Sequence, residues 1–452
     1  MVAGASSDLG DRYRHSETGG TGGDAGTAVT HGSRHGGNKV SVEWSLVEES
    51  GGDAAPLAGT WLVRAAGHGE WRTVANRALD DSAWLVSRSP GRWWLDDGLG
   101  EADAVLYRRH FDPPIPDGSH THADARDWLV TGGVCGLGHV WLDGAYLGDV
   151  RGRHYRHAFE ITGRLGPGDG RGATHLIAIE AAHPPNRPHP GPDTPVADIR
   201  IERTGPARIE RARVLVIEAD YDRAVLRISA TVDSAATYRS EVTTTVLPCV
   251  TPGTGETPGG GLARSSPVLA RGRNNLEWLV ALDQPALWWP AGMGAQPRYN
   301  VNIALSVNER TSHTVQCTTG IRTVSARRSG MLVNGEPRPT GPDSLTIIAH
   351  DLAHRGLYET ADAAGTLLCQ QITLDPSVLG GGQRSLRAVA ARAAAAAADH
   401  IGNHPSVAAW QPLRNLGGRR SIPGSGPLRD RIMRRALHDA DPTRPAWLLG
   451  GF

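Results

Sequence analysis

The chain has few cysteines and almost no lysine, and each scarcity argues against a class of protein. Its 452 residues include only four cysteines, Cys135, Cys249, Cys317 and Cys369, which stand far apart and form no CxxC pair. This pattern argues against a disulfide framework or a zinc ribbon and predicts reduced thiols. Lys39 is the single lysine, so arginine supplies the other positive charges.

Net charge and long apolar runs are absent as well. The chain has 47 basic and 47 acidic residues, which gives no electrostatic reason to expect nucleic acid or a membrane as partner. No run of about 20 apolar residues occurs, and the Gly-, Ser-, Thr- and His-rich residues 1–43 lack the apolar segment of a signal peptide. We therefore expect residues 1–43 to be disordered and the protein to be cytoplasmic.

Short apolar runs separated by Gly, Pro and Asp dominate from residue 44 to residue 195. The runs at residues 128–130, 139–142 and 175–179 have the spacing that is typical of a β-sandwich or jelly roll. Asp143-Gly144 predicts a hairpin turn, because both positions tolerate positive φ. The proline-rich residues 181–195 predict a linker, because proline cannot donate to a sheet ladder.

A second block of strand-like runs covers residues 196–325. Residues 224–229 and 242–246 are rich in β-branched residues, and residues 300–307 alternate polar and apolar side chains as a half-exposed strand does. The Gly/Pro-rich residues 251–261 predict a loop between strands. The block predicts an immunoglobulin-like β-sandwich.

The pattern changes after residue 326. Residues 385–400 include six consecutive alanines and predict a helix that ends before Gly402. An apolar strand at residues 406–410 and a second helix at residues 428–438 follow. Alternation of helix and strand predicts an α/β architecture, here part of a (β/α) barrel.

Eight motifs mark the chain in a fixed order. The first four are Tyr107-Arg108-Arg109-His110-Phe111, Val140-Trp141-Leu142-Asp143-Gly144, Trp288-Trp289-Pro290-Ala291-Gly292-Met293-Gly294 and Gly320-Ile321-Arg322. The next four are Val333-Asn334-Gly335-Glu336-Pro337, Tyr358-Glu359, Asn403-His404-Pro405-Ser406 with Trp410, and Asp441-Pro442-Thr443-Arg444-Pro445. In this order they resemble glycoside hydrolase family 2, which holds β-mannosidases, β-galactosidases and β-glucuronidases.

The resemblance implies three folded parts. These are a galactose-binding-like jelly roll over residues 44–195, an immunoglobulin-like sandwich over residues 196–325 and a (β/α) barrel region over residues 326–452. We expect the barrel to be incomplete, because about 125 residues are half of the ~250 that a barrel needs. The chain also ends before any strand that resembles the family's nucleophile segment.

The barrel strand that resembles the family's acid/base strand departs from the family at its end. In the family this strand continues into Asn-Glu, and that Glu is the catalytic acid/base. Here Gln411 and Pro412 follow Trp410, and the acid/base position falls on Asn415 or, with a shift of one residue, on Leu416. A retaining glycosidase needs two carboxyl groups about 5–5.5 Å apart, so the resemblance predicts a degenerate member of the family.

We therefore assign no catalytic residue, and Glu359 remains the alternative acid. The resemblance implies Trp410, Asn415, His404 and Glu359 as substrate-binding residues. A metal is not expected, because His350 and His354, which are four residues apart, lack the glutamate of an HExxH motif. A nucleotide cofactor is not expected either, because the Gly-rich residues 133–138 precede a strand instead of a helix.

Three functions stay open at this point. The first is a family 2-like protein of carbohydrate metabolism that lacks hydrolytic activity and retains carbohydrate binding. The second is an active β-mannosidase- or β-galactosidase-type O-glycosyl hydrolase. The third is a fragment of a split or decayed gene. Carbohydrate is the expected partner in the first two, and the sequence specifies neither the sugar nor the oligomeric state.

Overall fold

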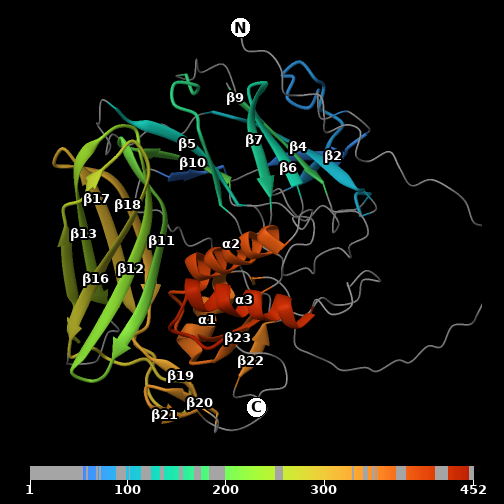
Figure 1. Ribbon diagram of the computed structural model, residues 1–452. Helices are drawn as coiled ribbons and strands as arrows, with labels where there is room; N and C mark the ends of the chain where they lie inside the picture. Colours follow the sequence, from blue (N-terminus) through green and yellow to red (C-terminus); the bar gives the residue numbers. More distant parts are fainter. Residues whose placement is uncertain are drawn as a thin grey trace, which may run out of the picture. The chain divides into compact units, whose positions relative to one another are not determined.

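The computed structural model describes most of the chain from residue 54 onward (Figure 1). The described residues are 54–57, 60–67, 70, 73–87, 98–100, 102–112, 124–132, 137–151, 156–166, 175–182, 199–249, 258–327, 330–338, 345–348, 352–353, 355–372, 383–412 and 426–446. The predicted disordered segment 1–43, most of the predicted linker and both Asn415 and Leu416 lie outside these residues.

Two antiparallel sheets form the first β-rich part. One has the order β1 (Ala54–Pro56), β10 (Ile199–Thr204), β5 (Arg126–Thr131) and β8 (His157–Glu160). The other has the order β3 (Leu85–Ser87), β2 (Trp61–Ala65), β4 (Ala104–Phe111), β9 (His175–Ala182), β6 (Leu137–Leu142) and β7 (Ala145–Arg151).

A single apolar core joins these two sheets. Leu129 and Ile201 reach it from the four-stranded sheet, and Val140 and Ile177 reach it from the six-stranded sheet. The pair is therefore a β-sandwich, called the first sandwich below. The predicted hairpin turn at Asp143-Gly144 is confirmed, since these residues have φ of 50° and 85° between β6 and β7.

Two further antiparallel sheets form the second sandwich. One has the order β11 (Ala207–Ala219), β12 (Arg223–Ser234) and β16 (Gly272–Asp283). The other has the order β14 (Gly261–Ser265), β13 (Tyr238–Pro248), β17 (Tyr299–Val307) and β18 (Arg310–Thr319), with β15 (Val268–Leu269) beside β13.

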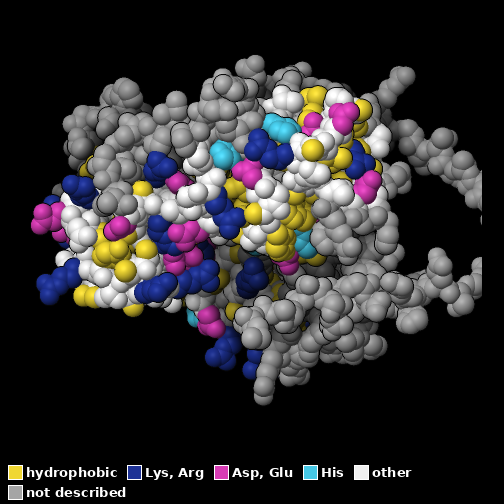
Figure 2. Space-filling view, turned by 90° about the horizontal axis from the view of Figure 1, so that it is seen from above, with side chains coloured by type: hydrophobic (Ala, Val, Ile, Leu, Met, Phe, Trp, Pro, Cys, Tyr) yellow, Lys and Arg dark blue, Asp and Glu magenta, His cyan; other side chains and the backbone are white. Residues whose placement is uncertain are grey.

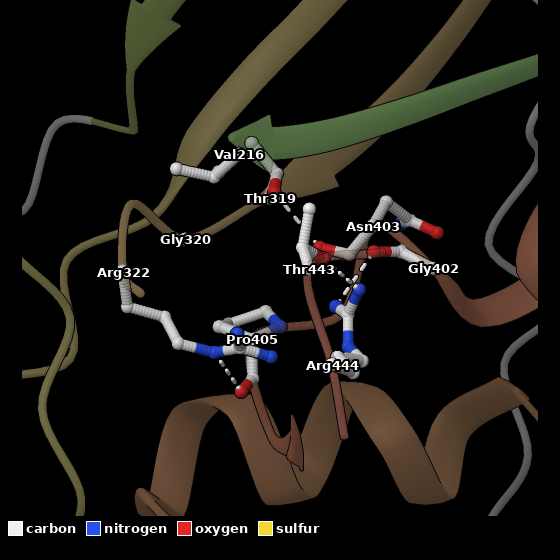
Figure 3. A pocket seen from close by; sticks show the side chains of 9 residues that line it. All are labelled: Val216, Thr319, Gly320, Arg322, Gly402, Asn403, Pro405, Thr443 and Arg444. Atoms are coloured by element: carbon white, nitrogen blue, oxygen red, sulfur yellow. Dashed lines mark hydrogen bonds between the residues drawn. The ribbon is translucent and has the colours of Figure 1, made fainter. Parts of the chain in front are cut away.

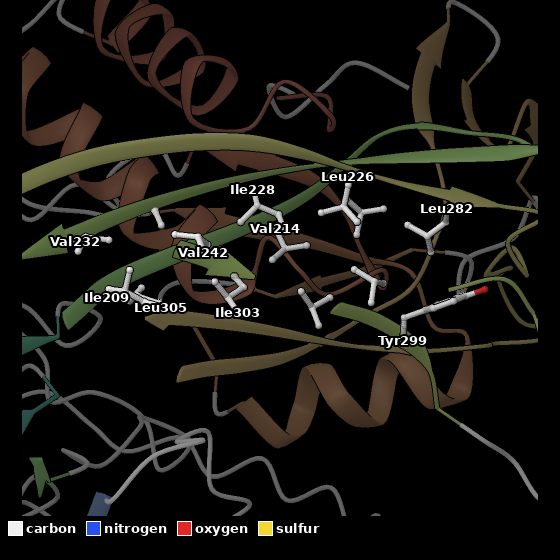
Figure 4. Packing of buried hydrophobic residues seen from close by; sticks show 14 of the residues in the cluster. Ile209, Val214, Leu226, Ile228, Val232, Val242, Leu282, Tyr299, Ile303 and Leu305 are labelled. Atoms are coloured by element: carbon white, nitrogen blue, oxygen red, sulfur yellow. The ribbon is translucent and has the colours of Figure 1, made fainter. Parts of the chain in front are cut away.

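The core of the second sandwich is aliphatic (Figure 4). Leu226 and Ile228 of β12 point toward Ile303 and Leu305 of β17 and are fully buried with them. The predicted alternation in residues 300–307 is confirmed, because every second residue of β17 is buried. Alternate burial of this kind lets each strand give one face to the core.

A hairpin and a parallel α/β part complete the described chain. The hairpin comprises β19 (Val324–Arg327), β20 (Gly330–Val333) and β21 (Glu336–Pro337). The α/β part comprises β22 (Thr346–Ile348), α1 (Arg355–Ala364), β23 (Leu368–Ile372), α2 (Gln383–Ile401), β24 (Val407–Pro412) and α3 (Gly426–Ala440). The two predicted helices and the predicted strand are thus confirmed with small shifts of their ends.

The sheet of the α/β part is short and open in the described residues. Strands β22, β23 and β24 are parallel, and a parallel bridge from Trp410 to Ala446 adds the start of a further pairing. Small residues of α2 such as Ala394 and Ala397 pack on this sheet. No closed barrel is present among the described residues, and none of their helices is long and apolar enough to cross a membrane.

Candidate functional site

Two glutamines mark the edge of the parallel sheet where ligands bind in α/β folds. That edge lies at the carboxyl ends of the strands, and Gln371 and Gln411 are the penultimate residues of β23 and β24. Both are buried, and the amide nitrogen of Gln371 donates to the amide oxygen of Gln411 over 2.7 Å. Sequence reasoning missed this pair, because it depends on the register of strands forty residues apart.

The neighbouring polar groups are also neutral. Tyr358 of α1 donates its hydroxyl to Gln370 over 2.6 Å, and Gln370 donates to the backbone oxygen of Gln371 over 2.7 Å. Burial raises the pKa of Tyr358 far above its ordinary value. Neither an amide nor this phenol can exchange a proton usefully at neutral pH.

Glu359 lies on α1, where Arg355 is its ion-pair partner. The two side chains are four residues apart, and Arg355 Nε donates to Glu359 Oε1 over 2.9 Å. About a third of the Glu359 side chain is exposed. A partly exposed carboxylate of this kind can accept hydrogen bonds from sugar hydroxyls.

Trp410, a predicted substrate-binding residue, is fully buried in the core of the α/β part. Its indole nitrogen donates to Asp441 over 2.9 Å, and Arg444 donates to the same carboxylate oxygen over 2.7 Å. Burial works against ionisation of Asp441, yet Arg444 and the hydrogen bonds hold its pKa below the ordinary value. In this arrangement the indole packs against protein on its faces.

His404 is equally buried and lies before the amino end of β24. Its Nδ1 is 2.6 Å from one carboxylate oxygen of Asp362, whose other oxygen accepts the backbone N–H of Ser406 over 3.0 Å. Its ring also lies 5.4 Å from the ring of Tyr358. The structure therefore separates His404 from the carboxyl edge that holds Gln411.

The four predicted substrate-binding residues do not share one surface in the described structure. Trp410 and His404 are interior, Glu359 is on a helix, and Asn415 lies outside the described residues. Sugar binding by these residues stays a prediction. Among the described residues no group of three or more His, Cys, Asp or Glu is arranged to hold a metal ion.

A small polar pocket of about 10 Å³, room for about one water molecule, lies where the second sandwich meets the α/β part (Figure 3). Arg322 donates to the carbonyl oxygens of Pro405 and Val407 over 2.9 and 2.6 Å. Arg444 donates to Val407, Gly402 and His404 carbonyls over 2.6 to 3.0 Å. The two guanidinium groups thus fix the loop that leads into β24, a positioning role that the motifs alone did not indicate.

A second contact holds α2 and α3 on the second sandwich. Arg213 of β11 pairs with Asp399 of α2 over 2.6 Å and donates to the carbonyl of Ala440, the last residue of α3, over 2.6 Å. A cation at a helix C-terminus also interacts favourably with the helix dipole. These contacts pack the C-terminal helices on the second sandwich.

Antiparallel sandwiches precede a parallel α/β layer, and the motif residues Arg322 and Trp288 form hydrogen bonds across the junction. Residues 207–322, from the start of β11 to Arg322, match the family described as glycosyl hydrolases family 2. The chain is therefore related to family 2, as its motifs predicted.

The curated relatives are both named exo-β-D-glucosaminidases. An exo-β-D-glucosaminidase of Amycolatopsis orientalis is 28% identical over 336 residues, which covers 67% of this chain and 31% of the relative. An exo-β-D-glucosaminidase of Streptomyces avermitilis is 28% identical over 228 residues, covering 45% of this chain and 24% of the relative. The chain thus spans less than a third of the length of these relatives.

Solved structures show the same fold. A β-glucuronidase of Bacteroides uniformis superposes with a TM-score of 0.67 at 15% identity, covering 88% of this chain and 52% of that one. The exo-chitosanase of Amycolatopsis orientalis superposes with a TM-score of 0.64 at 20% identity, covering 87% and 52%. At this identity the likeness concerns the fold alone.

Proposed function

We propose that this chain is a family 2-type protein of carbohydrate metabolism that binds carbohydrate and does not hydrolyse it by itself. The observation that carries the proposal is the amide pair Gln371–Gln411 at the carboxyl edge of the parallel sheet. Both side chains of this pair are neutral, and the acid/base position that the motifs imply, Asn415 or Leu416, is neutral as well. Between Trp410 and Asp430 the sequence contains no Asp or Glu at all.

Glycoside hydrolysis needs two carboxyl groups. One carboxylic acid must protonate the leaving oxygen, and general acid catalysis alone contributes roughly 10²–10⁴-fold in rate. The second carboxylate must stand about 5–5.5 Å away in a retaining enzyme. Glu359, with Arg355 as its partner on α1, is the carboxylate to which the alternative, an active hydrolase, would assign the acid role.

We further propose the domain boundaries that the motifs implied. They are a sugar-binding-like jelly roll over residues 44–195, an immunoglobulin-like sandwich over residues 196–325 and an incomplete barrel over residues 326–452. Separate apolar cores in the first sandwich, the second sandwich and the α/β part support this division.

The names of the relatives suggest which sugars to test. The curated relatives are exo-β-D-glucosaminidases, and the solved structures include a β-glucuronidase. Oligomers of β-linked glucosamine are therefore the first ligands to try, with uronides and neutral hexosides as comparisons.

One experiment tests binding and turnover together. Aryl β-glucosaminide, β-mannoside, β-galactoside and β-glucuronide are incubated with the full chain, and glucosamine oligomers are titrated by calorimetry. We expect heat of binding without release of the aryl group. Turnover that disappears in Glu359→Gln, and persists in the exposed control Glu336→Gln, would contradict the proposal and favour the hydrolase.

A further inference from the structure

Three aromatic rings form a cluster on the six-stranded sheet of the first sandwich. His139 and Trp141 of β6 and Tyr146 of β7 have ring centroids 6.0 Å (His139–Trp141), 6.1 Å (His139–Tyr146) and 5.7 Å (Trp141–Tyr146) apart. Trp141 is buried with 6% of its surface exposed, whereas Tyr146 is 53% exposed. The buried ring and the imidazole therefore hold an exposed tyrosine ring in a fixed place.

Two carboxylates flank the imidazole of this cluster. In the sheet register His139 stands opposite Asp149 of β7 on one side and Glu180 of β9 on the other. His139 Nδ1 lies 2.8 Å from Asp149, and its Nε2 lies 3.8 Å from Glu180. The hydroxyl of Tyr146 also donates to Asp149. We call these five residues the Tyr146 surface.

The environment of Glu180 favours an additional cation. Only 15% of its side chain is exposed, and its 3.8 Å separation from His139 is too long for a hydrogen bond. Burial raises the pKa of Glu180, and His139 acts in the opposite direction. A bound ammonium group with N–H donors would complete the partners of this carboxylate.

We propose that the Tyr146 surface binds positively charged amino-sugar units, at a site separate from the parallel sheet. Carbohydrate rings stack their C–H faces on exposed aromatic rings, and a ring that is already held in place costs little entropy on binding. The ammonium group of the same sugar donates to Glu180. Figure 2 shows hydrophobic, acidic, arginine and histidine side chains intermingled on one face of the molecule.

This inference rests on the proposed carbohydrate binding and names its place and its chemical class. A neutral sugar would use the ring of Tyr146 but leave Glu180 without a cation. A lysine-rich peptide would bring ammonium groups but no rigid pyranose face for the ring. A sugar that carries a free amine satisfies both features of the surface.

The test compares two oligomers of equal length, one of β-linked glucosamine and one of N-acetylglucosamine. Each is titrated calorimetrically into the full chain, below the pKa of the sugar amine, with the wild type, Tyr146→Ala and Glu180→Gln. The matched controls are Tyr221→Ala, an exposed tyrosine of the second sandwich, and Glu277→Gln on β16. Thermal unfolding reports whether each variant is folded.

We expect the wild type to bind the glucosamine oligomer about tenfold or more tightly than the acetylated one. Tyr146→Ala and Glu180→Gln should each weaken that binding about tenfold, and the controls should not change it. Should Tyr146→Ala fail to fold, Glu180→Gln, which keeps the shape of the side chain, carries the test.

Results that contradict this inference can be distinguished from results that contradict the proposed function. Sugar binding that ignores both variants, or equal binding of both oligomers, overturns the inference and leaves the proposed function standing. A lysine-rich peptide that binds the wild type as tightly as the glucosamine oligomer also overturns it. No binding of any sugar by the folded wild type overturns the proposed function and, with it, the inference.

Discussion

The side-chain amides of Gln371 and Gln411 are joined by a 2.7 Å hydrogen bond between directly opposed residues of β23 and β24. Both side chains are buried, and the hydroxyl of Tyr358 and the amide of Gln370 extend the network. Buried polar networks are stable when each member finds a partner and costly when a charge is introduced without one. A neutral side chain is therefore more stable than a charged one at this edge of the sheet.

We predict that Gln411→Glu destabilises the protein at neutral pH by about 1–3 kcal/mol. Burial raises the pKa of a carboxyl group at this place, so the penalty is present above that pKa and disappears as the pH falls through it. Urea unfolding between pH 4 and pH 8 measures the effect. The control Gln316→Glu, at an exposed position of β18, should show no such dependence, and equal behaviour of both variants would count against a neutral network.

A second prediction concerns the buried side chain of Trp410. Trp410→Phe removes the indole donor to Asp441 and leaves a small cavity in the α/β core. We expect a loss of about 2–4 kcal/mol in the free energy of unfolding, with unchanged affinity for glucosamine oligomers. Unfolding by urea and calorimetric titration measure the two quantities. A variant of unchanged stability with weakened sugar binding would restore the interpretation of Trp410 as a stacking residue.

Local features of the fold were predictable from the sequence, and the arrangement of the site was not. The helix over residues 385–400 and the turn at Asp143-Gly144 depend on neighbours in the chain, and both are confirmed. Which face of a strand meets the core is not given by a motif, so the interior position of the Trp410 side chain could not be predicted from it. The partners of Gln371 and Tyr146 depend on strand register.

The family motifs likewise predicted some features of the chain and not others. The order of the motifs predicted a family relationship that residues 207–322 confirm. It did not reveal that Arg322 and Arg444 converge on the loop before β24, because the two arginines are more than a hundred residues apart in the chain. Side chains that position a loop look the same in a sequence as side chains that bind a ligand.

A third prediction concerns Asp362, which accepts hydrogen bonds at both carboxylate oxygens. Asp362→Ala leaves His404 and the backbone N–H of Ser406 without their acceptor in a buried place. We expect the free energy of unfolding to fall by about 3–5 kcal/mol, because a buried polar group loses its partner. Chemical denaturation of the full chain measures this loss.

Asp439→Ala is the matched control for that change. Asp439 also lies in the α/β part, but 65% of its side chain is exposed and its partner Arg435 is 3.7 Å away. An exposed pair at this spacing contributes little. A comparable loss in both variants would show that the Asp362–His404 pair has no special role in stability.

The last prediction follows from Glu202, which is buried between the two sandwiches with Arg200 and Arg208. The carboxylate lies 2.5 Å from Arg200 and 2.7 Å from Arg208. Burial opposes its ionisation, but the attraction of Arg208, Arg200 and His313 outweighs burial and lowers its pKa from 4.5 to about 2. A pKa lower in the folded than in the unfolded state stabilises the folded protein wherever the group is ionised. This contribution, about 3 kcal/mol, is complete above the unfolded pKa and is lost as the pH falls from 4.5 toward 2.

Urea unfolding measured across this range should show the free energy of unfolding falling with pH in the wild type. In Glu202→Gln the fall should be smaller by that amount, whereas the exposed control Glu241→Gln should follow the wild type. Parallel curves for wild type and Glu202→Gln would mean that the arginines do not hold this carboxylate ionised in the folded state.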